Sequence, residues 1–254
     1  MKMGTFKAYF RKEMIESIRS YRYLVLAVGI LMFAIADPIM MKLLPIIMKN
    51  QTNGADLSAL FVVSNESVLL MYIKDSFQIG FMFVVFTMSG ILSDEKSTQK
   101  FVFPYAKGAS QAGIVLAKIL HYCIFIFLMT MLGVCISHYY TGLLIKGTPV
   151  PFETVLFVGL MLSAYYIFYS VVATFLSAIV GKGLVAGFIT LGIAYLSVFI
   201  NNVKSVNEFV PYMLINNANG LKILDCSKTI LSCVVIGTIL VFFTIRHMKK
   251  AEIV

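Results

Sequence analysis

The sequence predicts an all-α membrane protein with six transmembrane helices, and three observations support this fold class. Hydrophobic residues make up 59% and charged residues 13% of the 254-residue chain, whereas ordinary soluble domains have about 45–50% and about 25%. The mean hydropathy is +0.89. Six nearly uncharged stretches are each long enough to cross the hydrocarbon core of a bilayer. A water-soluble globule is excluded, because too few polar side chains are available to cover its surface.

The six stretches divide the whole chain, so we expect one transmembrane domain over residues 1–254. The expected spans lie near residues 23–41, 76–93, 119–138, 154–180, 183–203 and 229–245. The sixth stretch is at the short end of the roughly 17–25 residues that a spanning helix needs.

The distribution of basic side chains predicts which way the chain faces. An even number of spans puts both termini on one side, and fourteen of the 21 Lys and Arg residues then fall on that side. Because Lys and Arg accumulate on the cytoplasmic side of membrane proteins, both termini are expected to be cytoplasmic. The net charge of +9 therefore indicates orientation rather than nucleic-acid binding. Glu13 and Glu16 precede the first span, which argues against a cleaved signal peptide.

Residues 5–22 are predicted to form a helix that lies along the inner membrane surface and bends into the first span. Six apolar side chains fall within about half of the helix circumference. They are Phe6, Tyr9, Phe10, Met14, Ile18 and Tyr21. Because Lys7, Glu13 and Ser17 interrupt this arc, an alternative remains open in which the segment is a charged lead that only orients the first span.

The longest cytoplasmic connection is expected between the second and third spans, over residues 94–118. Its acidic start at Asp94 and Glu95 is typical of a helix N-terminus, where the macrodipole favours negative charge. The apolar residues 101–103 then need either a partner surface or the inner leaflet to cover them, and the sequence leaves both options open. On the outer side, the apolar residues 209–214 favour a short re-entrant or interfacial helix before the sixth span.

Motifs for catalysis, nucleotide binding and metal binding are missing from the sequence. The chain has no His-Glu-x-x-His, Cys-x-x-Cys or Gly-x-Ser-x-Gly pattern, and residues 142–148 place Thr148 where a phosphate loop needs Lys. His121 and His138 lie near the two ends of the third span, where packing is a simpler explanation than proton relay. We therefore expect no catalytic residue, cofactor or metal site within this chain.

Two intramembrane features have more than one interpretation. Asp37 precedes Pro38, which favours a helix break near the outer interface with Asp37 as the N-cap. A carboxylate inside a span is also a candidate contact for a substrate or an ion. Gly183 and Gly187 form a small-xxx-small pair at the start of the fifth span, and this pair fits packing between subunits as well as packing within one chain.

Taken together, these features resemble the permease subunits of ABC-2 type transporters over the whole chain. In that family the inner loop reads Glu, then Gly-Thr, then Leu-rich turns and Pro-x-Ser-Arg, followed by a Lys that enters the third span. The residues that keep these relative places are Glu95, Ser110 and Lys118, and the departures are Gln99-Lys100 for Gly-Thr, Gly108 for Pro and Gln111 for Arg. The architecture therefore carries more of the resemblance than the motif does.

The resemblance implies a second permease copy and two copies of a separately encoded ABC ATPase, which alone binds ATP and Mg, in the membrane of a bacterial cell. The inner loop is then a coupling helix that contacts the ATPase. Its expected contact residues are Asp94, Glu95, Ser97, Thr98, Lys100, Phe101 and Phe103, with Lys182 in a smaller second contact. In its overall arrangement of spans and loops, the chain is also similar to the membrane subunits of staphylococcal exporters of phenol-soluble modulins, which are short amphipathic peptide toxins.

The predicted function is ATP-driven export of a hydrophobic or amphipathic compound, such as a peptide toxin or an antimicrobial peptide. The spans offer apolar and aromatic walls with few charges, which suits such a substrate arriving from the inner leaflet. The alternative is a secondary transporter or channel that uses Asp37 as its coupling carboxylate. A membrane-embedded enzyme ranks third, because no cluster of carboxylates, histidines or nucleophiles lies within the spans.

Overall fold

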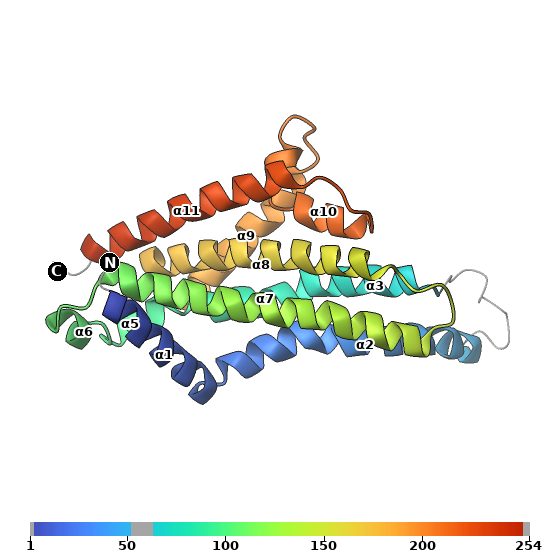
Figure 1. Cartoon of the computed structure of the whole chain (residues 1–254), viewed down its shortest axis with the longest axis horizontal. Coiled ribbons are helices and arrows are strands. Elements are labelled where there is room, and N and C mark those ends of the chain that lie inside the picture. Colours follow the sequence, from blue (N-terminus) through green and yellow to red (C-terminus); the bar gives the residue numbers. More distant parts are fainter. Residues whose placement is uncertain (1–2, 52–62, 251–254) are drawn as a thin grey trace.

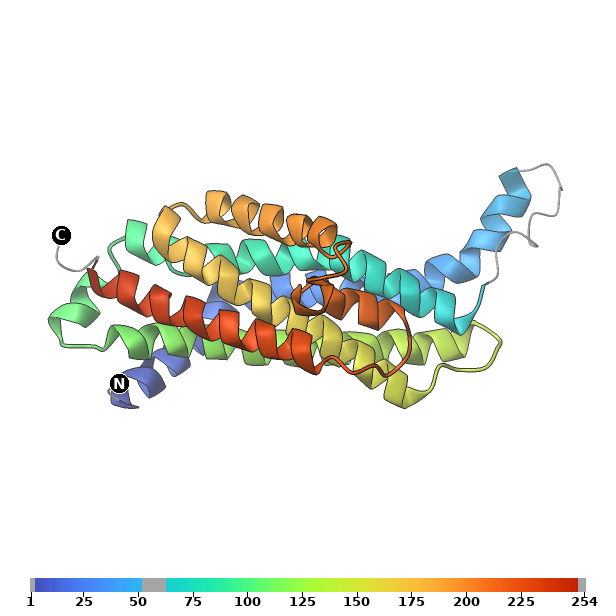
Figure 2. The same cartoon turned by 90° about the horizontal axis from the view of Figure 1, so that it is seen from above.

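The chain forms an elongated bundle of helices in the computed structural model, which describes residues 3–51 and 63–250 (Figure 1). It is 83% helical, and the described residues contain no strand. Six helices are long and apolar enough to cross a membrane. The predicted all-α class with six spans is therefore confirmed. The beginning of the first helix and the end of the last lie at the same end of the bundle (Figure 2). Residues 1–2 and 251–254, the two chain ends that were expected to be cytoplasmic, lie outside the described residues.

The helices follow one another along the chain with short connections. They are α1 (Met3–Arg19), α2 (Arg22–Gln51), α3 (Asn65–Asp75), the π-helical turn η2 (Ser76–Gly80), α4 (Phe81–Ser89), α5 (Ser93–Ser97), α6 (Val102–Ala106), α7 (Gln111–Leu144), α8 (Phe152–Val180), α9 (Gly183–Ile200), the short helical turn η3 (Asn207–Phe209), α10 (Met213–Asn219) and α11 (Ser227–Lys250). The six span-like helices are α2, the continuous segment from α3 to α5, α7, α8, α9 and α11.

The first span is longer than the sequence predicted. α2 runs through Pro38 and ends at Gln51 rather than near Met41, so the expected helix break with Asp37 as N-cap is wrong. Proline removes one helical hydrogen bond and introduces a local clash. Within a bundle, neighbouring helices can hold such a helix together across the proline.

The second span begins earlier than predicted, at Asn65 instead of Ser76. Ser64 caps its first turn, because its side chain accepts from the Ser67 backbone while the Ser67 side chain accepts from the Ser64 backbone. Asp75, which had been taken as the outer boundary of the span, therefore lies inside a continuous helical segment. The π-helical turn η2 follows it directly.

The remaining spans lie near their predicted positions with shifted ends. α7 begins at Gln111, before the expected start at 119, and continues to Leu144. α8, α9 and α11 match the stretches 154–180, 183–203 and 229–245 to within a few residues. The outer segment before α11 contains η3 and α10 rather than one helix over 209–214.

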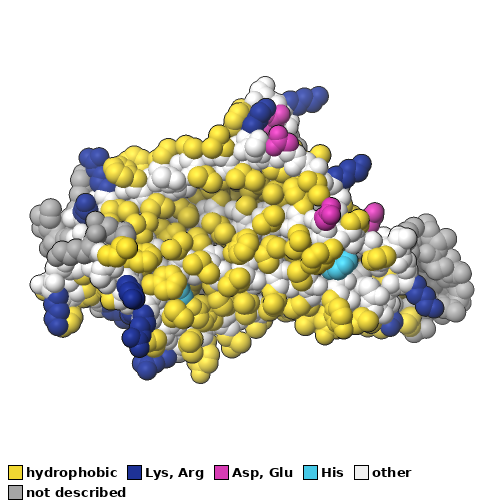
Figure 3. Space-filling view, viewed as in Figure 1, with side chains coloured by type: hydrophobic (Ala, Val, Ile, Leu, Met, Phe, Trp, Pro, Cys, Tyr) yellow, Lys and Arg dark blue, Asp and Glu magenta, His cyan; other side chains and the backbone are white. Residues whose placement is uncertain are grey.

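α8 forms the centre of the bundle. In its most apolar window 72% of the residues are buried, against 17% in α11, and it packs against α4, α7, α9, α10 and α11 (Figure 2). Hydrophobic side chains cover the middle of the face seen in Figure 3, and charged side chains lie toward its edges. This outer surface is what a lipid-facing bundle requires, since charged side chains are costly in the hydrocarbon region.

α1 packs against α7 with its polar side. The chain turns between α1 and α2 at Tyr21, whose φ is 58° (Figure 1). Glu13 and Ser17 are completely buried, whereas Met14 and Ile18 of the apolar arc are exposed. The buried Glu13 and Ser17 therefore help to bind α1 to the bundle, together with Phe10, whose ring contacts His121 of α7, while Met14 and Ile18 are free to face another surface.

The connection between α4 and α7 contains two short helices instead of the single one expected. α5 begins at Ser93, at the acidic N-terminus that the sequence indicated, and α6 begins at Val102. Gln99 lies between them with φ 54°, a left-handed conformation that interrupts the helix. The backbone N–H groups of Leu92 and Ser93 donate to the Ser177 hydroxyl of α8 at 3.2 and 3.0 Å, which ties α5 to the centre of the bundle.

Candidate functional site

A network of buried charges joins three parts of the chain at the end of the bundle where α1 and α5 lie (Figure 1). The Lys118 ammonium of α7 lies 2.6 Å from Glu13 of α1 and 3.0 Å from Glu95 of α5. These three side chains are at most 2% exposed. Lys12 also pairs with Glu95 and lies 3.1 Å from Glu13. Because removing one partner of a buried ion pair is strongly destabilising, the network holds α1, the inner loop and α7 together.

Glu16 and Lys100 extend this network toward solvent. Lys12 lies 2.7 Å from Glu16, and Lys100 lies 3.4 Å from it. Burial alone would raise the pKa of Glu16, but the hydrogen bond and charge of Lys12, helped by Lys100, lower that pKa to about 2. Burial alone would lower the pKa of Lys12, but the charge of Glu13 and hydrogen bonds to two further carboxylates raise that pKa above its ordinary value. Both groups therefore stay charged at neutral pH.

Three carboxylates of the network converge as metal ligands can. The carboxylate oxygens of Glu13, Glu16 and Glu95 lie within 4.8 Å of one another. The ammonium groups of Lys12 and Lys118 contact all three. The chain thus supplies the positive charge that balances these carboxylates.

A second group of polar contacts joins α1 and the start of α2 to α7. The hydroxyls of Ser17 and Tyr122 are 2.8 Å apart, and the Arg22 guanidinium donates to Tyr122 at 3.4 Å. One turn away, the Tyr23 hydroxyl and His121 Nε2 are hydrogen-bonded at 2.9 Å. His121, considered above for proton relay, is therefore held in the contact between α2 and α7.

The residues expected to contact a partner are divided between the interior and an exposed edge. Glu95 and Phe101 are 2% and 5% exposed, and they face this chain's own helices. Phe103 and its neighbour Val102 are instead 67% and 64% exposed. The other expected contact residues are also exposed, namely Asp94, Ser97, Thr98, Lys100 and Lys182. Of the expected contact residues, only those on this exposed edge can touch another protein, and Glu95 connects the edge to Lys118.

The turn between α8 and α9 lies beside the inner loop. A Cβ atom at Gly183 would be 3.2 Å from the Asp94 carboxylate, and one at Gly187 would be 2.8 Å from the Phe86 ring. The small-xxx-small pair therefore lets α9 approach the second span within one chain. Since Lys182 directly precedes Gly183, it belongs to the same exposed surface as Asp94.

The residues on which the family resemblance depends have identifiable roles. Lys118 pairs with Glu95, and Ser110 caps α7 by accepting a backbone hydrogen bond from its first turn at 3.4 Å. Gln99, which stands where the family has glycine, adopts the left-handed φ that glycine tolerates best. Gly108 has φ 72°, which the proline of the family motif cannot adopt, so the chain departs from the family pattern there.

Asp37 is buried in the half of the bundle away from the ion network. Its side chain is 2% exposed, and its Oδ2 atom has no hydrogen-bond partner. The charged group that interacts with it is the Asp75 carboxylate, which directly precedes the stretch 76–93 predicted as the second span. With the N-cap interpretation excluded, Asp37 remains a candidate contact for an ion or a substrate.

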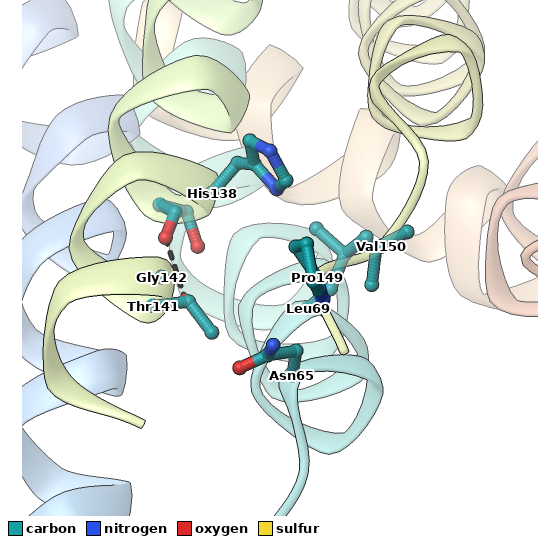
Figure 4. A pocket seen from close by; sticks show the side chains of 8 residues that line it. Asn65, Leu69, His138, Thr141, Gly142, Pro149 and Val150 are labelled. Carbon is teal, nitrogen blue, oxygen red and sulfur yellow. Dashed lines mark hydrogen bonds between the residues drawn. The ribbon is translucent and has the colours of Figure 1, made fainter. Parts of the chain in front are cut away.

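Two cavities differ greatly in what they can hold. The one in Figure 4 lies between α3, the end of α7 and the following loop, where Asn65, His138 and Thr141 face it. Its volume of about 10 Å³ suffices for no more than about one water molecule. A groove of about 510 Å³ between α7, α8 and α11 is larger, and apolar side chains such as Phe168 and Val234 line it. This groove has room for an organic ligand, as has a second one of about 470 Å³ that Phe175, Ile179, Phe243, Arg246 and His247 line.

The fold is that of a multi-pass membrane protein, and at one end of its bundle the buried charges pair with one another. No family model, curated protein or solved structure matches the chain. Its function therefore has to be argued from its own residues.

Proposed function

We propose that this chain is the membrane permease subunit of an ATP-driven, ABC-2 type exporter in the bacterial cell membrane, with both termini in the cytoplasm. The observation that carries this proposal is the buried ion pair between Glu95 and Lys118, which connects the exposed edge around Phe103 to the long apolar helix α7. A separate ATPase subunit would bind that edge, around the exposed Phe103. ATP and Mg would bind to that subunit.

The contacts around α5 allow force on the inner loop to reach several spans. Lys118 passes motion of Glu95 to α7, and Glu13 links the same ammonium to α1. Ser177 joins the start of α5 to α8. A rigid unit of this kind moves as one body, which is how docking of a partner at one end can change the packing of membrane helices.

The substrate that suits these spans is a hydrophobic or amphipathic compound, with amphipathic peptide toxins or antimicrobial peptides as the leading candidates. The groove between α7, α8 and α11 is apolar and opens on the outer surface of a single chain. Two permease copies would place such surfaces around a shared pathway. The small number of charged residues in these three helices disfavours a hydrophilic ion as the transported compound.

Reconstitution tests this proposal directly. The chain is purified together with the proposed ATPase subunit and placed in vesicles, and ATP hydrolysis is measured with and without an amphipathic helical peptide. We expect the peptide to stimulate hydrolysis and Phe103→Ala to reduce that stimulation several-fold, because Phe103 belongs to the proposed contact. Leu160→Ala, at an exposed position of α8 far along the helix, serves as the control. Peptide transport that continues without ATP would refute the proposal.

One observation favours the alternative of a secondary transporter or channel. Asp37 is a buried carboxylate with an unpartnered oxygen inside a span, as the coupling group of such a transporter would be. Loss of transport in Asp37→Asn, with transport in the unmodified chain driven by an ion gradient alone, would support this alternative.

A further inference from the structure

The half of the bundle away from the ion network contains two carboxylates that face each other. Asp37 of α2 is 2% exposed, and Asp75, at the end of α3, is half-buried. The Asp75 side chain is close enough to Asp37 to interact with its carboxyl group. When both groups are ionised, neither can donate a hydrogen bond to the other, so the pair needs either a shared proton or a cation between the two carboxylates. Among the described residues, no Lys, Arg or His forms a salt bridge with either carboxylate.

Further unpartnered oxygen atoms lie beside this pair. The Tyr72 hydroxyl is completely buried, has no hydrogen-bond partner and is close enough to Asp37 to interact with its charge. The Ser76 hydroxyl, near that of Tyr72, is 1% exposed and also unpartnered. Pro38 has no N–H, so the buried carbonyl of Ala34 lacks its helical donor and points along α2 toward Asp37.

The backbone around the pair is shaped to keep these oxygen atoms in place. The π-helical turn η2 begins at Ser76, and the Tyr166 hydroxyl donates to the Ser76 carbonyl at 2.7 Å. Gly133 of α7 makes room for the Tyr72 hydroxyl, since a Cβ atom there would lie 2.5 Å from it. The site is therefore built by α2, α3, α7 and α8 together. An isolated acidic pair on a flexible surface would have none of this support.

We propose that Asp37 and Asp75 together bind a hard divalent cation, such as Ca²⁺ or Mg²⁺, inside the bundle. The available ligands are all oxygen atoms, which hard cations prefer. Two carboxylates balance a charge of +2, and an unbalanced buried charge would be costly in a membrane. The half-buried Asp75 provides a route for the ion. This site does not depend on the proposed ATPase partner.

Thermal unfolding of the purified full-length chain in detergent tests the site. The chain has no Trp, but its free cysteines, two of them buried, report unfolding through a thiol-reactive dye. After chelator treatment, Ca²⁺ or Mg²⁺ is added, with choline chloride as the ionic-strength control. At a hundred times the dissociation constant we expect the melting temperature to rise by about 5–10 °C. Asp37→Asn and Asp75→Asn should lose this rise, whereas the exposed-residue control Glu153→Gln should keep it.

The metal-free melting temperature provides a second readout that separates loss of the site from failure to fold. Asp37→Asn removes the repulsion between the carboxylates, so the variant should melt at a higher temperature than the unmodified chain when no divalent ion is present. A variant that melts lower and binds nothing would contradict the proposal. Equal cation responses in the unmodified chain and in both Asn variants would also overturn it. Stabilisation by acid alone, without any metal response, would show that the pair holds a proton instead.

Discussion

The two buried acidic regions of this chain differ in how their charge is balanced. At the inner end, Glu13 and Glu95 share the ammonium of Lys118, and each is at most 2% exposed. In the other half of the bundle, Asp37 faces Asp75, and no basic side chain of the described residues pairs with either of them. Both regions join several helices, but only the inner one is electrostatically complete within the chain.

This difference separates a structural role from a binding role. A charge network that is satisfied by its own lysines holds elements together and can transmit motion between them. An acidic pair without a basic partner has to take up a proton or a cation, because buried charge must be neutralised. We therefore propose a coupling role for the network around Lys118 and a binding role for the Asp37–Asp75 pair.

The largest effect is expected from breaking the inner network. Lys118→Met removes the buried one of the two ammonium groups that Glu13 and Glu95 share and leaves them only the partly exposed Lys12, which should destabilise the chain by about 3–5 kcal/mol. Thermal unfolding measures this change, and Lys182→Met, at an exposed position, is the matched control. Adding Glu13→Gln to Lys118→Met should recover part of the loss. A single-variant effect below about 1 kcal/mol would contradict the coupling role of the network.

The space beside the Tyr72 hydroxyl gives a second test, which concerns the Asp37–Asp75 region. Gly133→Ala places a methyl group 2.5 Å from the Tyr72 hydroxyl, and overpacking of this kind costs about 1–3 kcal/mol. It should also weaken the response to divalent cations, since the hydroxyl is displaced. Gly142→Ala is the control, because nothing lies within 4 Å of its added Cβ. Equal stability and equal cation response of the two variants would mean that the Tyr72 hydroxyl does not belong to the cation site.

Acid should weaken the inner network through Glu16. Its pKa in the folded chain is about 2, below the ordinary value of 4.5. The stability that Glu16 contributes is therefore present above about pH 4.5 and is lost as the pH falls toward 2. In melting curves between pH 5 and pH 2.5, Glu16→Gln should show a smaller decline than the unmodified chain. The variant Glu153→Gln, at an exposed outer position, should decline as the unmodified chain does.

The smallest effect is expected in the inner loop itself. Gln99 has φ 54°, and glycine adopts this conformation without the cost that other residues incur. Gln99→Gly should therefore stabilise the chain by up to about 1 kcal/mol, measured by thermal unfolding. Lys96→Gly, within helix α5, should do the opposite. Destabilisation by Gln99→Gly would mean that its side chain makes contacts that matter more than its backbone conformation.

The sequence predicted the number of spans well and their ends less well. Charge-free stretches revealed all six helices because a bilayer demands them. The rule that charges bound a span failed for Asp75, which lies inside a helix capped by Ser64. The rule that proline ends a helix failed for Pro38, because packing in the bundle sustains α2 beyond it. Both failures occurred at the acidic pair, where the chain departs from local preferences.

The inner site was found only in part for a related reason. Glu95 was recognised from its place in the loop, but its burial and its pairing with Lys118 depend on tertiary packing. Glu13 carried a usable signal, since a charged residue within an apolar arc needs a partner. Nothing in the sequence indicated which residue that partner would be, because Glu13 and Lys118 lie on helices far apart along the chain.

Site-directed crosslinking tests the central claim, that a separate ATPase binds the exposed inner edge, most directly. A single cysteine is placed at Thr98 in a chain without Cys123, Cys135, Cys226 and Cys233, and a photoactivatable thiol reagent is attached in intact cells. We predict that the crosslinked protein, identified by mass spectrometry, carries a Walker phosphate loop, and that the same reagent at Leu160 captures no such protein. A Thr98 adduct that never contains a nucleotide-binding protein, in cells where transport is active, would contradict the account.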